Sequence, residues 1–182
     1  MLKSHAYGAS NLATKKSQRT VQSPQKLRII GGKWRGRTIP FPTVQGLRPT
    51  GDRIRETVFN WLTPTIEGAR CLDLFAGSGA LSFEALSRGA AHCTALELQD
   101  AAISQLRDSA TVLAAHDLRV VQTDSLQYLE NNVAEWQYDL AFVDPPFDTP
   151  LLSSACALLE RGQWLAVNAK IYCELSAADK SF

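Results

Sequence analysis

Several features that would place this protein in a membrane, outside the cell or around a metal are missing from the sequence. It has no apolar run of about 18 residues or more, and its first twenty residues lack the apolar stretch of a signal peptide. None of the three histidines lies at metal-ligand spacing, and no C-x-x-C pair occurs among the four cysteines, Cys71, Cys93, Cys156 and Cys173. We therefore expect a cytoplasmic protein with reduced, buried cysteines, no metal site and no membrane span.

Charge is distributed unevenly along the 182 residues, although the net charge is only +1. Residues 1–56 carry 12 Lys and Arg against 2 Asp and Glu, whereas the rest of the chain carries 7 against 16. A basic segment joined to an acidic body is typical of proteins that bind a polyanion. A basic tail that is merely solvated would have the same composition.

The sequence divides into three predicted regions. Residues 1–26 are polar and lack a hydrophobic period, so we expect a disordered basic tail. Residues 27–63 form an extension in which two short extended pieces flank a Gly-Gly break and a helix follows Thr50. In that helix we expect Ile54, Val58, Trp61 and Leu62 to face inward, and Pro64 to end it.

Residues 64–182 show the alternation of an α/β domain. Short apolar runs, expected to be strands, occur at 69–76, 92–98, 118–123, 138–144 and 169–175. Amphipathic stretches, expected to be helices, lie near 78–88, 100–115, 125–136 and 149–161. This order predicts a mostly parallel, doubly wound sheet with helices on both faces, to which residues 27–63 add a short β/helix extension.

A glycine-rich turn follows the first predicted strand of this domain. The strand ends in Asp73, and Phe75, Gly77 and Gly79 follow before the next helix. Open α/β sheets bind ligands at this end of their strands, although a tight strand-to-helix turn alone also requires glycines. The third glycine of the dinucleotide fingerprint is missing, which argues against NAD.

Polar residues also end the second and third predicted strands. Glu97 is placed to accept hydrogen bonds from both hydroxyls of a ribose, or is an ordinary exposed acid. Asp124, followed by Ser125, is placed to bind an adenine amino group, or is only the N-cap of the next helix.

The fourth predicted strand leads directly into Asp144, Pro145, Pro146 and Phe147. The carboxylate of Asp144 and the carbonyl of Pro145 can accept hydrogen bonds from the two N–H groups of an amine whose lone pair is delocalised into a base or amide. The prolines keep that carbonyl out of regular secondary structure, and Phe147 offers a face on which a planar target stacks. A rigid loop that caps the following helix is the simpler alternative.

Together, these motifs resemble the Rossmann-like class I methyltransferases that act on exocyclic amino groups. The resemblance implies S-adenosylmethionine as the methyl donor, bound by the polar and glycine residues of the first three strand ends. A sulfonium methyl donor needs no metal.

The N-terminal half narrows the resemblance further. The segments RIIGGKWRGR (28–37) and LRPTGDRIRETVFNWL (47–62) are similar to the leader of the RsmD family, bacterial 16S rRNA guanine-N2 methyltransferases that act on small-subunit particles. The resemblance covers about residues 27–175 and implies that residues 144–147 hold the guanine amino group. The residues expected to touch rRNA, by phosphate contact and stacking, are Arg28, Lys33, Trp34, Arg35, Arg37, Arg48, Arg53 and Arg55.

The sequence departs from this family at its end. Such methyltransferases usually carry two further strands as a hairpin after the fifth strand, and only seven residues follow Leu175 here. We therefore expect a C-terminally truncated domain and a monomer that can self-associate through the exposed sheet edge. The alternatives are a catalytically weak RNA-binding fragment, a DNA adenine-N6 methyltransferase, which usually adds a recognition domain, and a protein glutamine methyltransferase, which has no need of a basic arm.

Overall fold

A parallel β-sheet forms the centre of the computed structural model, which describes residues 25–41, 51–146 and 149–175. Its strands run in the order β5-β4-β3-β6-β7, and every neighbouring pair is parallel, as predicted. The strands are β3 (Arg70–Asp73), β4 (His92–Glu97), β5 (Leu118–Gln122), β6 (Tyr138–Val143) and β7 (Leu165–Cys173).

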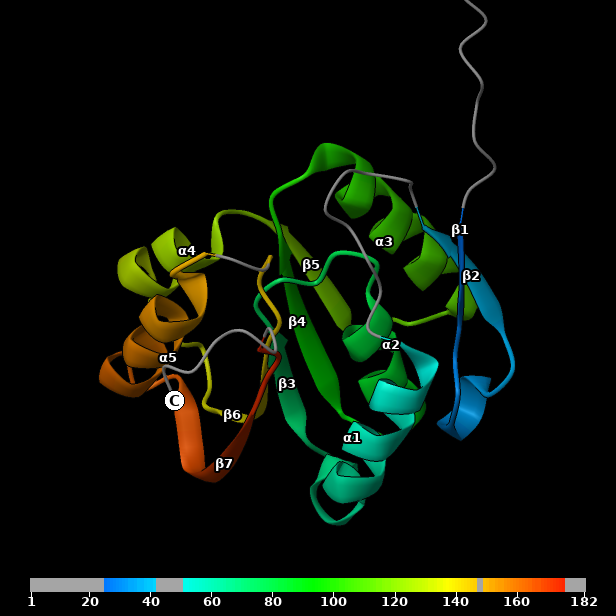
Figure 1. Cartoon of the computed structure of the whole chain (residues 1–182), viewed down its shortest axis with the longest axis horizontal. Coiled ribbons are helices and arrows are strands. Elements are labelled where there is room, and N and C mark those ends of the chain that lie inside the picture. Colours follow the sequence, from blue (N-terminus) through cyan, green and yellow to red (C-terminus); the bar gives the residue numbers. More distant parts are fainter. Residues whose placement is uncertain (1–24, 42–50, 147–148, 176–182) are drawn as a thin grey trace, which may run out of the picture.

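Helices cover both faces of this sheet (Figure 1). One face carries α1 (Asp52–Ile66), α2 (Ala80–Ser87) and α3 (Asp100–Leu113), and the other carries α4 (Ser125–Asn131) and α5 (Leu151–Arg161). The alternation of side chains along each strand supplies both cores. On β6, Leu140 and Phe142 pack in the cluster under α1 and α2, whereas Ala141 and Val143 pack under α4 and α5.

The N-terminal extension is a β-hairpin that lies outside α2 and α3 (Figure 1). Strand β1 (Gln25–Arg28) pairs antiparallel with β2 (Thr38–Phe41), and a short 3₁₀ turn, η1 (Gly32–Trp34), lies between them. This arrangement confirms the two extended pieces around the Gly-Gly break. The apolar residues of the hairpin belong to the same core cluster as α2, so the extension packs as part of the domain. Residues 1–24 of the predicted tail lie outside the described residues.

Helix α1 differs from its prediction in its inward face and in its end. Arg55, Val58 and Phe59 are buried, whereas Ile54 is 46% exposed and Trp61 is 76% exposed. The expected stripe was confirmed at Val58, and Leu62 is partly buried against the same core. It was wrong at Ile54 and Trp61, because Arg55 has a buried anionic partner on α2 that turns its own face of the helix inward. The prediction that Pro64 ends the helix is also wrong: the helix continues to Ile66, and the carbonyl that loses its partner belongs to exposed Asn60, where water can reach it.

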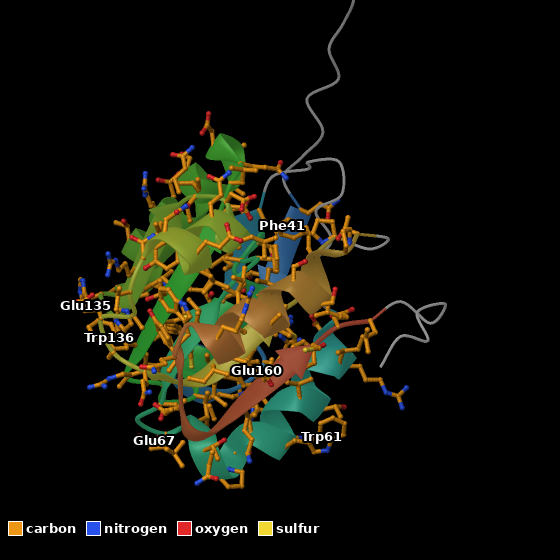
Figure 2. The ribbon with its side chains drawn as sticks, turned by 90° about the vertical axis from the view of Figure 1, so that its left-hand side faces the viewer. Phe41, Trp61, Glu67, Glu135, Trp136 and Glu160 are labelled. Carbon is orange, nitrogen blue, oxygen red and sulfur yellow. The ribbon has the colours of Figure 1, made fainter. Side chains whose placement is uncertain are left out.

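Strand β7 lies at one end of the sheet and borders an apolar groove. The groove has a volume of about 410 Å³ and runs between α1, which contributes Val58 and Trp61, and the aromatic residues Phe142 and Tyr172 of β6 and β7. Figure 2 shows Trp61 projecting from α1 beside β7. Self-association through this edge stays a prediction. Within the described ranges, every helix is too short or too polar to cross a membrane.

Candidate active site

The predicted site residues of the sheet domain gather at one edge of the sheet. They follow or end β3, β4, β5 and β6, which are neighbours in the sheet and all point the same way. The carboxyl ends of parallel strands meet at a common crevice, so residues far apart in sequence become neighbours. Those that the structure describes there are Asp73, Phe75, Gly77, Gly79, Glu97, Asp124, Ser125, Asp144, Pro145 and Pro146.

The glycine-rich turn after β3 is tightly packed. Gly79 has a φ of +77°, and a Cβ at this position would lie 2.6 Å from both the Phe83 ring and the Leu106 side chain. Both the backbone conformation and the packing therefore require glycine there. Gly77 donates its N–H to the Glu97 carboxylate at 2.8 Å, so the turn is also tied to the end of β4.

The carboxylate of Glu97 is fixed by three backbone amides. Its Oε2 accepts from Gly77, and its Oε1 accepts from the amides of Leu98 and Gln99, each at 2.8 Å. Glu97 thus holds the glycine turn in place, a structural role that was not predicted from the sequence. Each carboxylate oxygen can accept more than one hydrogen bond, so Glu97 retains acceptor capacity for a ligand hydroxyl.

Asp73 is buried with only part of its hydrogen-bonding capacity used. Its Oδ2 accepts from the Ser82 hydroxyl at 2.6 Å, whereas its buried Oδ1 has no partner among the described residues. Burial raises the pKa of Asp73 to about 6, against the opposing effects of the Ser82 hydroxyl and of the backbone amides of Phe75 and Ser82. A donor group on a ligand would satisfy this oxygen, which makes Asp73 the strongest indication of a bound cation or N–H at this edge.

At the start of α4, Asp124 has the simpler of its two predicted roles, that of a helix cap. The residue is the N-cap, and its carboxylate accepts from the amide of Gln127 at 3.0 Å. Contact of Asp124 with an adenine stays a prediction. Ser125 is buried, and its hydroxyl donates a hydrogen bond to the carbonyl of Leu74, which joins α4 to the backbone after β3.

The loop after β6 continues directly from the end of the strand. Pro145 is buried, Pro146 is exposed, and the Thr149 hydroxyl donates to the Pro146 carbonyl at 2.8 Å. Phe147 lies outside the described residues. Beside the loop, the Glu174 amide donates to the Val143 carbonyl at 3.2 Å. Glu174 was predicted only as part of a strand, although its position at a strand's carboxyl end is the same signal that identified Glu97.

The basic residues of the extension divide into exposed and buried groups. The expectation of RNA contact fails for Arg55, which is fully buried, and for Trp34, which is only 7% exposed and is covered by Lys33, with the ammonium 4.5 Å from the ring centre. Arg48 lies outside the described residues. The exposed members of the predicted set are Arg28, Lys33, Arg35, Arg37 and Arg53.

A buried carboxylate that the sequence analysis missed holds the extension in place. Glu84 accepts from the amides of Ile30 and Gly31 at 2.9 and 2.8 Å and from the guanidinium groups of Arg88 and Arg55 at 2.7 and 3.3 Å. It is the one charged residue of α2, all of whose residues are buried. A charged residue inside such an apolar helix is the signal that could have identified it.

The strand order, the glycine turn after β3 and the acid that ends β4 define the class of protein as a Rossmann-like methyltransferase. The family model described as Conserved hypothetical protein 95 matches residues 27–182. The chain is 50% identical over 149 residues to Ribosomal RNA small subunit methyltransferase D of Escherichia coli (strain K12), covering 82% of this chain and 74% of that protein. It therefore belongs to the RsmD family of methyltransferases.

Two further relatives agree with this assignment. The protein of the same name from Haemophilus influenzae is 45% identical over 159 residues, which cover 85% of this chain and 82% of that protein. The solved structure of yhhF from Escherichia coli superimposes with a TM-score of 0.78 at 48% identity, covering 85% of each chain.

Proposed function

We propose that this protein transfers a methyl group from S-adenosylmethionine to the exocyclic N2 amino group of a guanine in the 16S rRNA of the small ribosomal subunit. The curated relatives are named as small-subunit rRNA methyltransferases. The observation that carries the proposal is the Asp144-Pro145-Pro146 loop, which follows β6 immediately beside the glycine turn of β3.

The residues at the strand ends match the chemical groups of S-adenosylmethionine. That molecule carries a cationic ammonium, ribose hydroxyls and an adenine amino group, all of them hydrogen-bond donors. The chain offers acceptors at the matching strand ends: the unpartnered oxygen of Asp73, the carboxylate of Glu97, and Asp124. When bound, the cofactor supplies an electrophilic methyl group on a sulfonium sulfur.

Asp144 and Pro145 have the main part in the reaction. Their carboxylate and carbonyl oxygens accept the two N–H bonds of the target amine, which draws the nitrogen lone pair out of conjugation with the ring. A bound methyl donor would supply the methyl group to this nitrogen, while Asp144 and Pro145 hold the nitrogen and its two N–H bonds in place. Holding the nitrogen in line with the methyl group supplies most of the rate, and the charge of Asp144 assists.

The exposed cations of the extension support a nucleic acid as the substrate. Arg28, Lys33, Arg35 and Arg37 lie on the hairpin, and Arg53 lies at the start of α1. Cations on a rigid hairpin suit contact with phosphates, which positions a nucleic acid without reading its sequence.

The test is transfer of a labelled methyl group from S-adenosylmethionine to small ribosomal subunits that lack the modification, with duplex DNA as a parallel acceptor. We expect N2-methylguanosine after digestion of the rRNA to nucleosides. Labelled N6-methyladenine in the DNA would replace the proposal with DNA methylation. No label in either acceptor, with donor binding retained, would leave an RNA-binding fragment.

Replacing Asp144 tests its role in the same assay. We expect Asp144→Asn to lower kcat by about 100-fold or more, since an amide provides neither the charge nor the same acceptor, while donor affinity changes little. Asp117→Asn is the matched control, because Asp117 is exposed next to the opposite end of the sheet, before β5. Turnover of Asp144→Asn equal to that of the control would remove Asp144 from the mechanism.

A further inference from the structure

Glu174 lies directly beside the candidate catalytic loop. The register of β6 and β7 pairs Val143 with Cys173, so the next residue on each strand, Asp144 and Glu174, leaves the sheet at the same point. The hydrogen bond from the Glu174 amide to the Val143 carbonyl, 3.2 Å, continues the ladder to this position. The two acids therefore stand side by side at the carboxyl edge of the sheet.

The two acids also belong to the same face of the sheet. Phe142 and Tyr172 precede them by two residues, and their rings meet edge to face on the α1 side with centroids 6.5 Å apart. Side chains alternate along a strand, so Asp144 and Glu174 continue this face. The hydroxyl of Tyr172 donates to Oε2 of Glu174 at 3.1 Å, which holds the Glu174 carboxylate on that side.

One oxygen of the Glu174 carboxylate remains available. The residue is half-buried, and within the described ranges Tyr172 is the only side chain that donates to it. Burial, together with the charges of Glu174 and Asp144, raises the pKa of Tyr172, so this hydroxyl stays protonated and keeps donating. Oε1 of Glu174 is thus an oriented acceptor next to the loop that is proposed to hold the target amine.

An acceptor at this place distinguishes guanine from the other bases that carry an exocyclic amine. In guanine the N2 amino group is adjacent to N1–H, a donor. In adenine and cytosine the ring nitrogen adjacent to the amino group has a lone pair, which a carboxylate repels.

We propose that Glu174 accepts the N1–H of the target guanine and thereby selects guanine at the active site, with Tyr172 as the residue that positions it. The inference rests on the proposed guanine-N2 methylation and names the residue that sets its base preference. Glu174 then selects guanine, whereas Asp144 and Pro145 hold the amine that is methylated.

A base analogue provides the test. The base 2-aminopurine keeps the 2-amino group but has a lone pair at N1, so rRNA is prepared with it at the acceptor position that the labelling assay identifies. We expect the parent to prefer guanine over 2-aminopurine by about 100-fold or more in kcat/KM. In Glu174→Gln the side-chain amide can donate to N1, so this preference should shrink by about 10-fold or more. The missing O6 of the analogue affects both proteins and cancels in the comparison.

Controls separate the possible failures. Glu160→Gln changes an exposed glutamate on α5 (Figure 2) and should keep the parental preference. Should Glu174→Gln fail to fold, Tyr172→Phe provides the second variant, which releases the carboxylate and should also narrow the preference. An unchanged preference in the folded variant would overturn the role of Glu174. A parent that forms no N2-methylguanosine would instead overturn the proposed function.

Discussion

At the scale of single residues, two buried carboxylates on or next to α2 show how surroundings separate a structural acid from a candidate ligand-binding one. Glu84 has four donors for its two oxygens, two of them on guanidinium groups. Asp73 accepts from one hydroxyl, with the backbone amides of Phe75 and Ser82 nearby, and its buried Oδ1 makes no hydrogen bond within the described residues. Its pKa rises to about 6 because burial penalises the charged form. An acid left unsatisfied at a ligand-binding edge is what a site for a donor-bearing ligand requires.

The raised pKa of Asp73 predicts how the stability of the ligand-free protein depends on pH. The folded-state value of about 6 lies above the unfolded value of 3.8, so the stabilisation is present below about pH 4 and is lost as the pH rises through 6. The loss amounts to about 3 kcal/mol. Asp73→Asn removes this titration, and urea unfolding at pH 4 and pH 7 should show the variant gaining about that amount relative to the parent. An equal difference at both pH values would contradict the assignment.

At the scale of elements, the hairpin and α2 form a close contact. The amide of Trp34 donates to the Ser87 hydroxyl at 2.9 Å, and that hydroxyl donates to the Gly31 carbonyl at 2.5 Å. A Cβ on Gly32 would lie 1.7 Å from the carbonyl oxygen of Ser87. Because α2 begins at the glycine turn, this contact fixes the proposed RNA-binding hairpin relative to the proposed donor site.

Two glycines of the hairpin test this contact as a matched pair. Gly32 and Gly36 both have positive φ, +74° and +82°, but a Cβ on Gly36 would meet nothing within 4 Å. Gly36→Ala should therefore cost only backbone strain, about 1 kcal/mol, whereas Gly32→Ala must also move the hairpin away from α2. We expect the larger loss of thermal stability in Gly32→Ala, with faster amide hydrogen exchange across residues 25–41. Equal effects of the two variants would mean that the contact between the hairpin and α2 contributes nothing to stability.

At the scale of the whole molecule, charge and apolar surface are separated. The exposed cations of the predicted RNA-binding set lie mainly on the hairpin, outside α2 and α3 (Figure 1). The acids Asp73, Glu97 and Asp144 lie at the carboxyl edge of the sheet. The apolar groove beside β7 lies between α1 and the far end of the sheet. Under the proposed function, the hairpin holds the phosphate backbone while the sheet edge receives a single base.

The salt dependence of RNA binding tests this arrangement. Arg35→Gln should reduce the slope of log affinity against log salt by about one unit, because one phosphate contact and its released counterion are lost. Arg161→Gln removes another exposed arginine, at the end of α5, and should leave the slope unchanged. Equal slopes for the two variants would show that the hairpin arginine is only solvated.

The positions of the strands and of the candidate site residues at their ends could be predicted from the sequence, because local patterns determine them. The apolar runs, the helical periods and the turn residues predicted every strand of the sheet within a few residues, and the glycine turn, Glu97, Asp124 and Asp144 were placed at strand ends. Their convergence follows from the parallel order, which brings the carboxyl ends of neighbouring strands together.

Only the tertiary structure decided which charges are buried and which faces of a helix are covered. Arg55 reads as an exposed arginine and Trp61 as a core residue, yet the structure reverses the two. The reason is Glu84, a buried acid 29 residues away in sequence, whose desolvation is offset only when a cation is buried with it. The side-by-side placement of Asp144 and Glu174 likewise depends on the pairing of β6 with β7, which no local pattern specifies.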